Sequence, residues 1–259
     1  MITIMRIKTV TWNIGGGKLL QPGTNPTLLS SYSNEGIDEI VSWLKRESPD
    51  VITLQETQKK DKNDQAEYIT KQLGYGYYFH DSTSDSHIDE GHKLGHAIIS
   101  RYPLASHKTG FFINPKVKVE WEDGSIATSF DKGYTNCAMT IEGSVVLITT
   151  LHLIPFRRFD IAIDSDLAAS IMRNVCNELD ISFERGIIQG DFNIDSKTLR
   201  SYMPRLFKSG MNEIPLSSPT TPKGRKYDHV LFKGLKLVKS RVDSSVLTDH
   251  FPVVCEFDF

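Results

Sequence analysis

The sequence predicts an α/β protein with more than one β-sheet. Apolar runs with strand-like alternation outnumber the segments with helical spacing, and the two kinds recur in turn along the chain. No internal repeat and no Gly-, Ser- or Pro-rich linker divides the 259 residues, so we expect residues 1–259 to form one domain. Strands mixed with helices in this way are typical of sheets that are covered by helices.

Local patterns predict the individual elements. The run at residues 5–12 alternates as a strand, and the apolar run at 51–54 forms the next. Further strands are expected at residues 75–80, 95–100, 106–113, 136–142, 145–153, 186–193, 227–232, 235–242 and 251–259. Helices are expected at 34–46, where Asn34 is a candidate N-cap, at 61–73 and at 160–179.

Two long irregular stretches, residues 15–33 and 113–133, interrupt these elements. Loops of this length are uncommon in a compact domain unless they have a function. We expect both loops to border the functional site and to determine its specificity.

Composition limits the classes of function. The sequence contains 30 Lys and Arg residues and 32 Asp and Glu residues, which gives a net charge of -2. This balance excludes the overall positive charge of a nonspecific nucleic-acid binder, but it allows a local basic patch. The candidate residues for such a patch are Arg157, Arg158, Lys116, Lys118, Lys223, Arg225 and Lys226.

The cysteines and the first residues bear on the compartment. Cys137, Cys176 and Cys255 are scattered, odd in number and set among apolar residues, which predicts buried free thiols and a reducing environment. The segment at residues 1–13 has no signal-peptide pattern, and no apolar run is long enough to span a membrane. We therefore expect a cytoplasmic protein, and no protein partner is implied.

Polar side chains stand where the apolar strands end. They are Asn13, Glu56, His152, Asp191 and Asn193, and the late segments add Asp228, Asp249 and His250. Each alone has an ordinary explanation as a turn former, a cap or a solvent-facing residue. Only the residues taken together indicate a functional site. Side chains at strand ends can converge on one crevice. Carboxylate and amide oxygens suit magnesium or manganese better than structural zinc.

Seven segments of the chain resemble the endonuclease/exonuclease/phosphatase superfamily. They are WN at 12–13, LQET at 54–57, GHAIISRYPL at 95–104, HL at 152–153, GDFN at 190–193, YDHVLF at 227–232 and TDHFPV at 248–253. These matches follow the order of the family and cover nearly the whole chain. The resemblance implies a four-layer α/β sandwich, with two packed mixed β-sheets flanked by helices. It also implies metal-dependent cleavage of a phosphoester by an activated water molecule.

The resemblance assigns metal ligands. Glu56 corresponds to the main ligand, with Asn13 in or near the metal shell. Asp249 is placed either to ligate the metal or to orient a histidine. The implied cofactor is Mg²⁺, with Mn²⁺ as an alternative.

The resemblance also assigns catalytic roles. Asp191 would orient and deprotonate the water, and Asn193 would support the phosphate and the attacking group. His250 and His152 would each donate a hydrogen bond to the phosphate, and Asp228 would pair with a histidine, for which we choose His152. A phosphodiester resists attack because it is an anion, so such a site must neutralise charge and orient water.

Four other features are weighed against ordinary roles. Arg157 and Arg158 follow His152 and are candidates for substrate contact, although ordinary surface arginines remain an equal alternative. Asp195 is expected to form a local turn or cap, and His229 to be structural on the face opposite Asp228. The histidines of GHKLGH, at 91–96, are expected in a loop and a strand rather than in a metal site.

The branch of the superfamily is harder to assign. LQET is common in abasic-site endonucleases, but HL at 152–153 is similar to sphingomyelinase, deadenylase, pancreatic-type deoxyribonuclease and tyrosyl-DNA phosphodiesterase members. Our leading hypothesis is a magnesium-dependent phosphodiesterase that acts on nucleic acid, its DNA or RNA being the expected partner. The alternative is a phosphatase or phosphodiesterase for a small phosphorylated metabolite or a lipid headgroup. A catalytically inactive binding module is a third hypothesis, and the presence of Glu56, Asp191, Asp249 and His250 argues against it.

Overall fold

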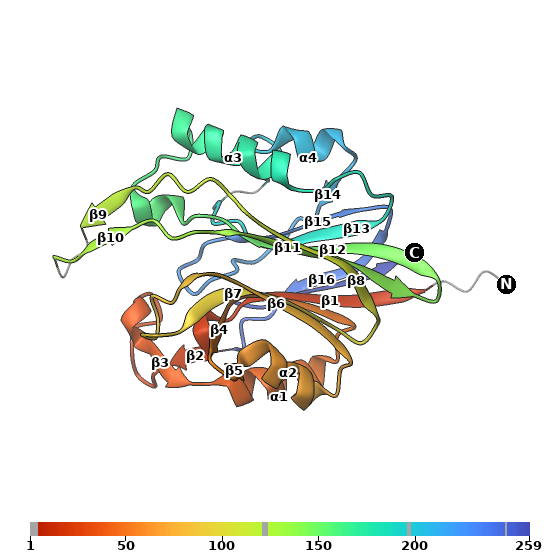
Figure 1. The fold of residues 1–259 in the computed structure, drawn as a ribbon, viewed down its shortest axis with the longest axis horizontal. Coiled ribbons are helices and arrows are strands. Elements are labelled where there is room, and N and C mark those ends of the chain that lie inside the picture. The colour runs from red at the N-terminus through yellow and green to blue at the C-terminus, as the bar shows by residue number, and fades with distance from the viewer. Residues whose placement is uncertain (1–4, 121–123, 196–197, 247) are drawn as a thin grey trace.

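Two mixed β-sheets pack face to face, and helices cover the outer face of each sheet (Figure 1). The computed structural model describes residues 5–120, 124–195, 198–246 and 248–259. The order helix, sheet, sheet, helix is the four-layer α/β sandwich that the resemblance implies. In Figure 1, α1 and α2 lie below the sheets, and α3 and α4 lie above them.

The first sheet combines strands from both ends of the chain. Within the described residues its order is β16-β17-β1-β4-β7-β6, and β5 pairs with the end of β4. The pair β1 and β4 is parallel, and the other neighbours are antiparallel. The bounds are β1 Arg6–Asn13, β4 Val51–Lys60, β5 Asn63–Asp64, β6 Tyr77–Asp85, β7 Lys93–Ser100, β16 Lys236–Val242 and β17 Val253–Asp258.

The second sheet is built from the middle of the chain. Its order in the described residues is β14-β15-β13-β12-β11-β8, with β12 and β13 parallel and the other pairs antiparallel. The bounds are β8 Leu104–Phe111, β11 Gly133–Ile141, β12 Ser144–His152, β13 Gly186–Asp191, β14 Asn212–Glu213 and β15 Asp228–Lys233.

Helices and two small hairpins complete the fold. The helices are α1 Ile37–Glu47, α2 Gln65–Leu73, α3 Asp166–Glu178 and α4 Pro204–Lys208, and 3-10 turns occur at Gly15–Gly17, Leu29–Ser31 and Phe156–Phe159. The hairpins pair β2 Lys18–Leu20 with β3 Tyr32–Glu35, and β9 Lys118–Glu120 with β10 Ile126–Thr128. The β9–β10 hairpin lies within the predicted loop at 113–133, and the β2–β3 hairpin begins in the predicted loop at 15–33 and extends to Glu35. Among the described residues, no helix has the length and apolar character needed to cross a bilayer.

Apolar clusters fill the three spaces between the layers. Ile40 of α1 and Ile69 of α2 pack on the first sheet, and Ile171 of α3 packs on the second. Ile98 and Ile187 belong to the cluster between the two sheets. Because β13 is covered on both faces, all of its residues are buried, including the consecutive apolar residues Ile187 and Ile188. The three cysteines are buried and free, as the sequence predicts.

Toward one edge, the space between the sheets becomes polar. Gln189 of β13 donates to Thr53 Oγ1 at 3.0 Å and accepts from Thr9 Oγ1 at 3.3 Å. Gln55 of β4 donates to Thr150 Oγ1 of β12 at 2.8 Å. These bonds join the two sheets beside the strand ends, where the polar side chains gather.

The helix boundaries differ from the predicted ones. Helix α1 begins at Ile37 after Gly36, so Asn34 is not its cap, and Asn34 instead lies in β3. Helix α2 begins only after Asp64, whose side chain accepts from the N–H of Glu67. Helix α3 begins after Ser165, whose side chain accepts from the N–H of Ala168. In the last two cases a capping side chain fixes the start of the helix more closely than the apolar spacing does.

Candidate active site

A cleft of about 820 Å³ lies at the polar edge of the sheets. It brings together residues that are far apart in the sequence and that the sequence selects as site residues: Asn13, Glu56, His152, Arg157, Arg158, Asp191, Asn193, Asp249 and His250. Asp228 lies directly behind His250. A second cavity of about 660 Å³, beside α2, contains none of these residues.

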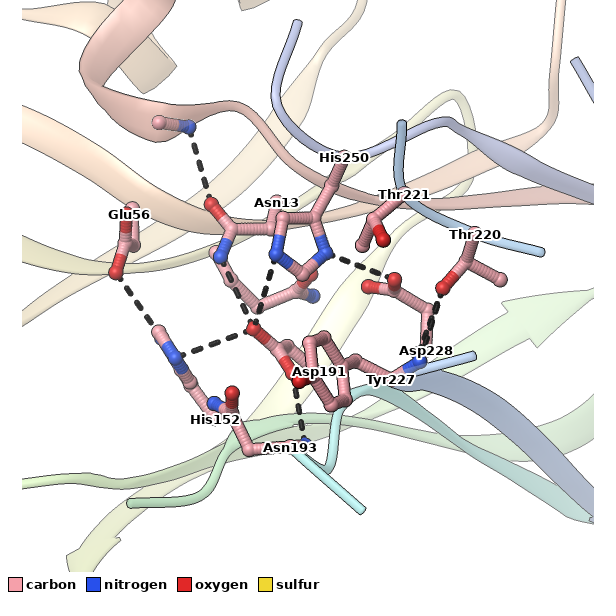
Figure 2. A network of polar contacts seen from close by, with 12 residues as sticks. Asn13, Glu56, His152, Asp191, Asn193, Thr220, Thr221, Tyr227, Asp228 and His250 are labelled. Carbon is pink, nitrogen blue, oxygen red and sulfur yellow. Dashed lines mark hydrogen bonds and ion pairs between the residues drawn. The ribbon is translucent and has the colours of Figure 1, made fainter. Parts of the chain in front are cut away.

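The parallel strand pairs explain why these side chains meet. Asn13 ends β1 opposite Gln55 of β4, and His152 ends β12 opposite Asp191 of β13. The carboxyl ends of parallel strands lie at the same edge of a sheet, so each pair delivers neighbouring side chains to that edge. The packing of the two sheets then places Asn13 in one cleft with His152 and Asp191 (Figure 2).

Glu56 reaches the cleft through a break in the strand register. The ladder between β4 and β7 shifts between Gln55 and Thr57, and Glu56 has a φ of 53°. In a regular strand Glu56 would point away from the side that Gln55 faces. The bulge allows Gln55 to bond across the sheets while the Glu56 carboxylate lines the cleft.

Asp191 is the centre of a hydrogen-bond network. Its Oδ2 accepts from Asn13 Nδ2 at 3.1 Å, and its Oδ1 accepts from the N–H of Asn193 at 2.8 Å (Figure 2). The Nε2 atoms of His152 and His250 lie 3.3 and 3.7 Å from Oδ2. Burial raises the pKa of Asp191 to about 7, and the negative charge of Asp228 adds to the effect. A carboxyl group of this kind exchanges a proton near neutral pH.

Asp228 pairs with His250, not with His152 as the sequence analysis supposes. Asp228 Oδ2 lies 2.8 Å from His250 Nδ1 (Figure 2). The register explains the correction, because Asp228 of β15 stands opposite Asp191 on one side of β13 while His152 stands on the other. Burial by itself lowers the pKa of His250, but the carboxylates of Asp228 and Asp191 outweigh it and raise this pKa well above its ordinary value.

Lys132 is a site residue that the sequence analysis misses. Its side chain lines the cleft, and its Nζ lies 3.5 Å from Glu56 Oε1 and 3.1 Å from His152 Nδ1. Burial lowers the pKa of Lys132, against the opposing effect of Glu56. Only the strand register places Lys132 at the site. Lys132 precedes Gly133, which stands opposite His152 in the hairpin of β11 and β12.

His87 is a second missed residue. It lines the cleft and stacks on Phe130, with ring centroids 4.7 Å apart. Burial lowers the pKa of His87 to about 4, so its imidazole is neutral at physiological pH. No motif surrounds either residue, and the predicted loop at 113–133 supplies both Phe130 and Lys132.

The predicted basic patch is divided in the structure. Arg157, Arg158, Lys223 and Arg225 line the cleft. Lys116 instead pairs with Asp131 at 2.7 Å and is not among the residues that line the cleft. Arg225 pairs with Asp195 at 2.6 Å, and the backbone N–H of Lys226 donates to Asp195 Oδ1 at 3.1 Å, so Asp195 contacts a distant segment. The local turn or cap that we expect there depends on residues 196–197, which lie outside the described residues. His229 is structural as expected, since it bonds Glu213 and the carbonyl of Ile194.

The sequence model of the Endonuclease/Exonuclease/phosphatase family matches residues 10–250. The chain belongs to the endonuclease/exonuclease/phosphatase family. Members of this family are phosphoric ester hydrolases, and this chain is therefore an enzyme of that class. No curated protein sequence is significantly similar to the chain.

Solved structures of the endonuclease/exonuclease/phosphatase family share the fold. An endonuclease/exonuclease/phosphatase from Beutenbergia cavernae DSM 12333 has a TM-score of 0.73 at 17% identity, covering 97% of this chain and 71% of its own. ANGEL2, a 2',3'-cyclic phosphatase in complex with adenosine-2',3'-vanadate, has a TM-score of 0.67 at 15% identity, and the match covers 100% of this chain and 97% of ANGEL2. The 3' phosphatase NExo from Neisseria, bound to a product DNA hairpin, has a TM-score of 0.60 at 17% identity, and the match covers 98% of this chain and 100% of NExo.

Enzymes of the endonuclease/exonuclease/phosphatase family depend on a metal, and the cleft offers oxygen donors for one. The carboxylates of Glu56 and Asp249 and the side chain of Asn13 line it together. Burial raises the pKa of Asp249, and the negative charge of Glu56 contributes, so a cation would relieve this pair. A Cβ atom added to Gly15 would lie only 2.7 Å from Asp249 Oδ1. Glycine at position 15 therefore leaves room for the Asp249 carboxylate.

A second group has donor atoms close enough to hold an ion. Those of Asp191, Asp228 and His250 lie within 4.8 Å of one another. His250 Nδ1 already bonds Asp228 Oδ2, and the two oxygens of Asp191 accept from Asn13 and Asn193. Both oxygens of Asp191 and one oxygen of Asp228 are thus engaged, whereas the carboxylates of Glu56 and Asp249 line the cleft and suit a hard cation better. Asn13, whose Oδ1 accepts from the N–H of Gly15, lines the cleft with them.

Proposed function

We propose that the enzyme is a divalent-metal-dependent phosphodiesterase that hydrolyses nucleic-acid phosphodiester bonds by activated water. The observation that carries this proposal is the buried arrangement in which His250, held from behind by Asp228, lines one cleft with Asp191, Glu56 and Asp249. Arg157, Arg158, Lys223 and Arg225 around that cleft supply the local positive charge that a polyanionic substrate needs. The DNA hairpin in the NExo structure and the adenosine-2',3'-vanadate in the ANGEL2 structure support a nucleic acid or a nucleotide-derived phosphoester as the class of substrate.

In the proposed reaction, Asp191 orients a water molecule and accepts its proton. Its pKa of about 7 suits a general base near neutral pH. Asn193, whose N–H holds Asp191 Oδ1, presents its side chain beside the attacking group. The protonated His250, held by Asp228, donates to a non-bridging phosphate oxygen. His152 is the second candidate donor to the phosphate.

Glu56, Asp249 and Asn13 are the proposed ligands of the cation, with Mg²⁺ preferred and Mn²⁺ as an alternative. When bound, such an ion would neutralise charge on the phosphate and make the water more acidic. The carboxylates stand on β4 and on the segment after β16, so the bound ion would join two parts of the first sheet.

A phosphatase or phosphodiesterase for a small phosphorylated metabolite or lipid headgroup is the second candidate. The volume of about 820 Å³ is within the range of small-molecule sites, which favours this alternative. A small substrate presents few phosphates, so its binding would depend weakly on salt, whereas an oligonucleotide that contacts four basic side chains would bind much less tightly at high salt.

The deciding experiment compares the two substrate classes. Purified enzyme is incubated with labelled single- and double-stranded DNA and RNA, and with phosphomonoesters, in Mg²⁺, Mn²⁺ or EDTA. We expect metal-dependent cleavage of an oligonucleotide that is lost in Glu56→Ala and Asp191→Asn and retained in the surface control Asp258→Asn. Phosphate release from monoesters with intact oligonucleotides would move the enzyme to the second candidate.

A further inference from the structure

Lys132 is a charged side chain in an environment where a lone ammonium is costly. Only 7% of the residue is exposed, and it stands at the turn into β11. A buried lysine is expensive unless a negative partner compensates its charge. The compensation comes from the cleft itself, since Glu56 Oε1 lies 3.5 Å from Nζ and the charge of Asp191 also acts on it.

The position of Lys132 also places it beside a proposed phosphate donor. Its Nζ lies 3.1 and 3.2 Å from the two ring nitrogens of His152. The Nε2 of the same ring lies 3.3 Å from Asp191 Oδ2. The ammonium is therefore close to the carboxylate proposed to hold the cation and to the imidazole proposed to bind the phosphate.

These contacts create a conflict when a divalent cation binds. The cation would be attracted to the same Glu56 carboxylate, and two positive charges would then lie a few ångströms apart in a buried site. A phosphate anion beside His152 would resolve this conflict, because the lysine could bond a phosphate oxygen instead. The alternative is a structural lysine that only neutralises Glu56 and never contacts the substrate.

We propose that Lys132 is a catalytic residue with two successive partners. It neutralises Glu56 in the metal-free enzyme, and it moves to a non-bridging oxygen of the scissile phosphate when the cation occupies Glu56. The second contact rests on the proposed phosphoesterase mechanism. Lys132 thus competes with the cation in the absence of substrate and cooperates with it in the presence of substrate.

The test uses ligands rather than turnover. Mn²⁺ binding to wild type and to Lys132→Met is measured by electron paramagnetic resonance, and inorganic phosphate binding is measured by calorimetry at saturating Mn²⁺. We expect Lys132→Met to bind Mn²⁺ on the order of tenfold more tightly and phosphate on the order of tenfold less tightly. General damage to the site would weaken both affinities, so the opposite signs are diagnostic.

Two further variants complete the design. Lys116→Met is the matched control, since Lys116 pairs with Asp131 on the neighbouring loop, and both affinities should stay at the wild-type level. Lys132→Arg keeps the positive charge, and we expect it to keep Mn²⁺ affinity near wild type while phosphate binding is largely retained. This variant also provides the comparison if Lys132→Met fails to fold: phosphate affinity lost in a folded Lys132→Arg, whose positive charge is unchanged, would contradict a phosphate contact made by that charge.

Equal Mn²⁺ affinity in wild type and folded Lys132→Met would overturn the competition, and unchanged phosphate affinity would overturn the substrate contact. These outcomes are separable from failure of the proposed nuclease activity. If the wild type binds Mn²⁺ and phosphate but cleaves no oligonucleotide, the choice of substrate is wrong, and the assignment of Lys132 is judged by the two affinities alone.

Discussion

At the scale of single residues, the bond between Asp228 and His250 determines which charge faces the substrate. The 2.8 Å contact engages Nδ1 and leaves Nε2 directed toward Asp191. A buried imidazole without the carboxylate would lose its proton readily, because burial lowers its pKa. Asp228 therefore keeps His250 in the form that can donate to a phosphate.

We predict that Asp228→Asn reduces kcat by about 10²- to 10⁴-fold. The asparagine has nearly the same shape but no negative charge, so His250 should be largely neutral at pH 7. Steady-state kinetics and thermal unfolding measure the two effects separately, with Asp258→Asn as the surface control. A kcat close to wild type would show that His250 does not need the carboxylate.

The sequence locates most of the site because its polar residues end apolar strands. Asn13, His152 and Asp191 are visible for that reason, and the resemblance to a family supplies their proposed roles. Lys132 and the partner of Asp228 are not visible in this way. Both depend on which strands are neighbours and in which register, and local patterns do not determine either property.

At the scale of elements, a hydrogen-bond chain supports the bulge that carries Glu56. Thr57 Oγ1 lies 2.9 Å from His80 Nε2, and His80 Nδ1 lies 2.7 Å from Asp64 Oδ1. Asp64 also caps α2 by accepting from the N–H of Glu67. The chain therefore ties the strand beside Glu56 to β6 and to the start of α2.

The stability provided by Asp64 should depend on pH. Burial raises the pKa of Asp64, but the hydrogen bond to His80 and the other favourable contacts outweigh it and lower this pKa to about 2. Because the folded pKa is below the unfolded one, the charge stabilises the fold above about pH 4, and this contribution decreases as the pH falls toward 2.

We predict that Asp64→Asn, which can still cap α2, lowers the free energy of unfolding by roughly 2 kcal/mol at pH 7. The difference from wild type should narrow steadily between about pH 4 and pH 2, as measured by urea unfolding. Asp85→Asn, at an exposed ion pair with Lys93, serves as the control. A difference that is constant across this range would exclude the charge as its cause.

Gly190, the glycine of GDFN, allows β12 and β13 to lie close together. Gly190 has a φ of 150°, and a Cβ atom there would lie 2.1 Å from the carbonyl oxygen of Leu151. A backbone atom cannot move aside as a flexible side chain can, so β12 and β13 would separate beside Asp191.

We predict that Gly190→Ala lowers the free energy of unfolding by about 3 kcal/mol. Gly74→Ala, at the end of α2, is the control because its φ is 70° but no atom lies within 4 Å of the added Cβ. It should cost about 1 kcal/mol, from backbone strain alone. Equal losses in the two variants, measured by chemical denaturation, would contradict the steric explanation.

At the scale of the whole molecule, the groups proposed for the reaction come from both sheets. Asn13 and Glu56 belong to the first sheet, and His152 and Asp191 belong to the second. The sequence predicts the individual strands, and the resemblance implies two sheets. The order of strands within each sheet results from long-range pairing, which periodicity alone does not reveal.

We predict that Mn²⁺ and inorganic phosphate together raise the melting temperature more than the sum of their separate effects. A ligand that binds only the folded state at about 100 times its Kd stabilises that state by about 2.7 kcal/mol. The joint effect should be lost in Glu56→Ala, as measured by differential scanning fluorimetry. Strictly additive shifts would show that the two ligands bind independently.

The division of the chain between the two sheets affects the timing of folding. The second sheet uses residues 104–233 without interruption, and the first uses the segments on either side. Either sheet could acquire its strands before the two have docked, yet each then holds only part of the groups that the reaction requires. During refolding, the rate at which hydrolytic activity returns would therefore report the docking of the two sheets. The rate of change in far-ultraviolet circular dichroism would report the formation of their strands.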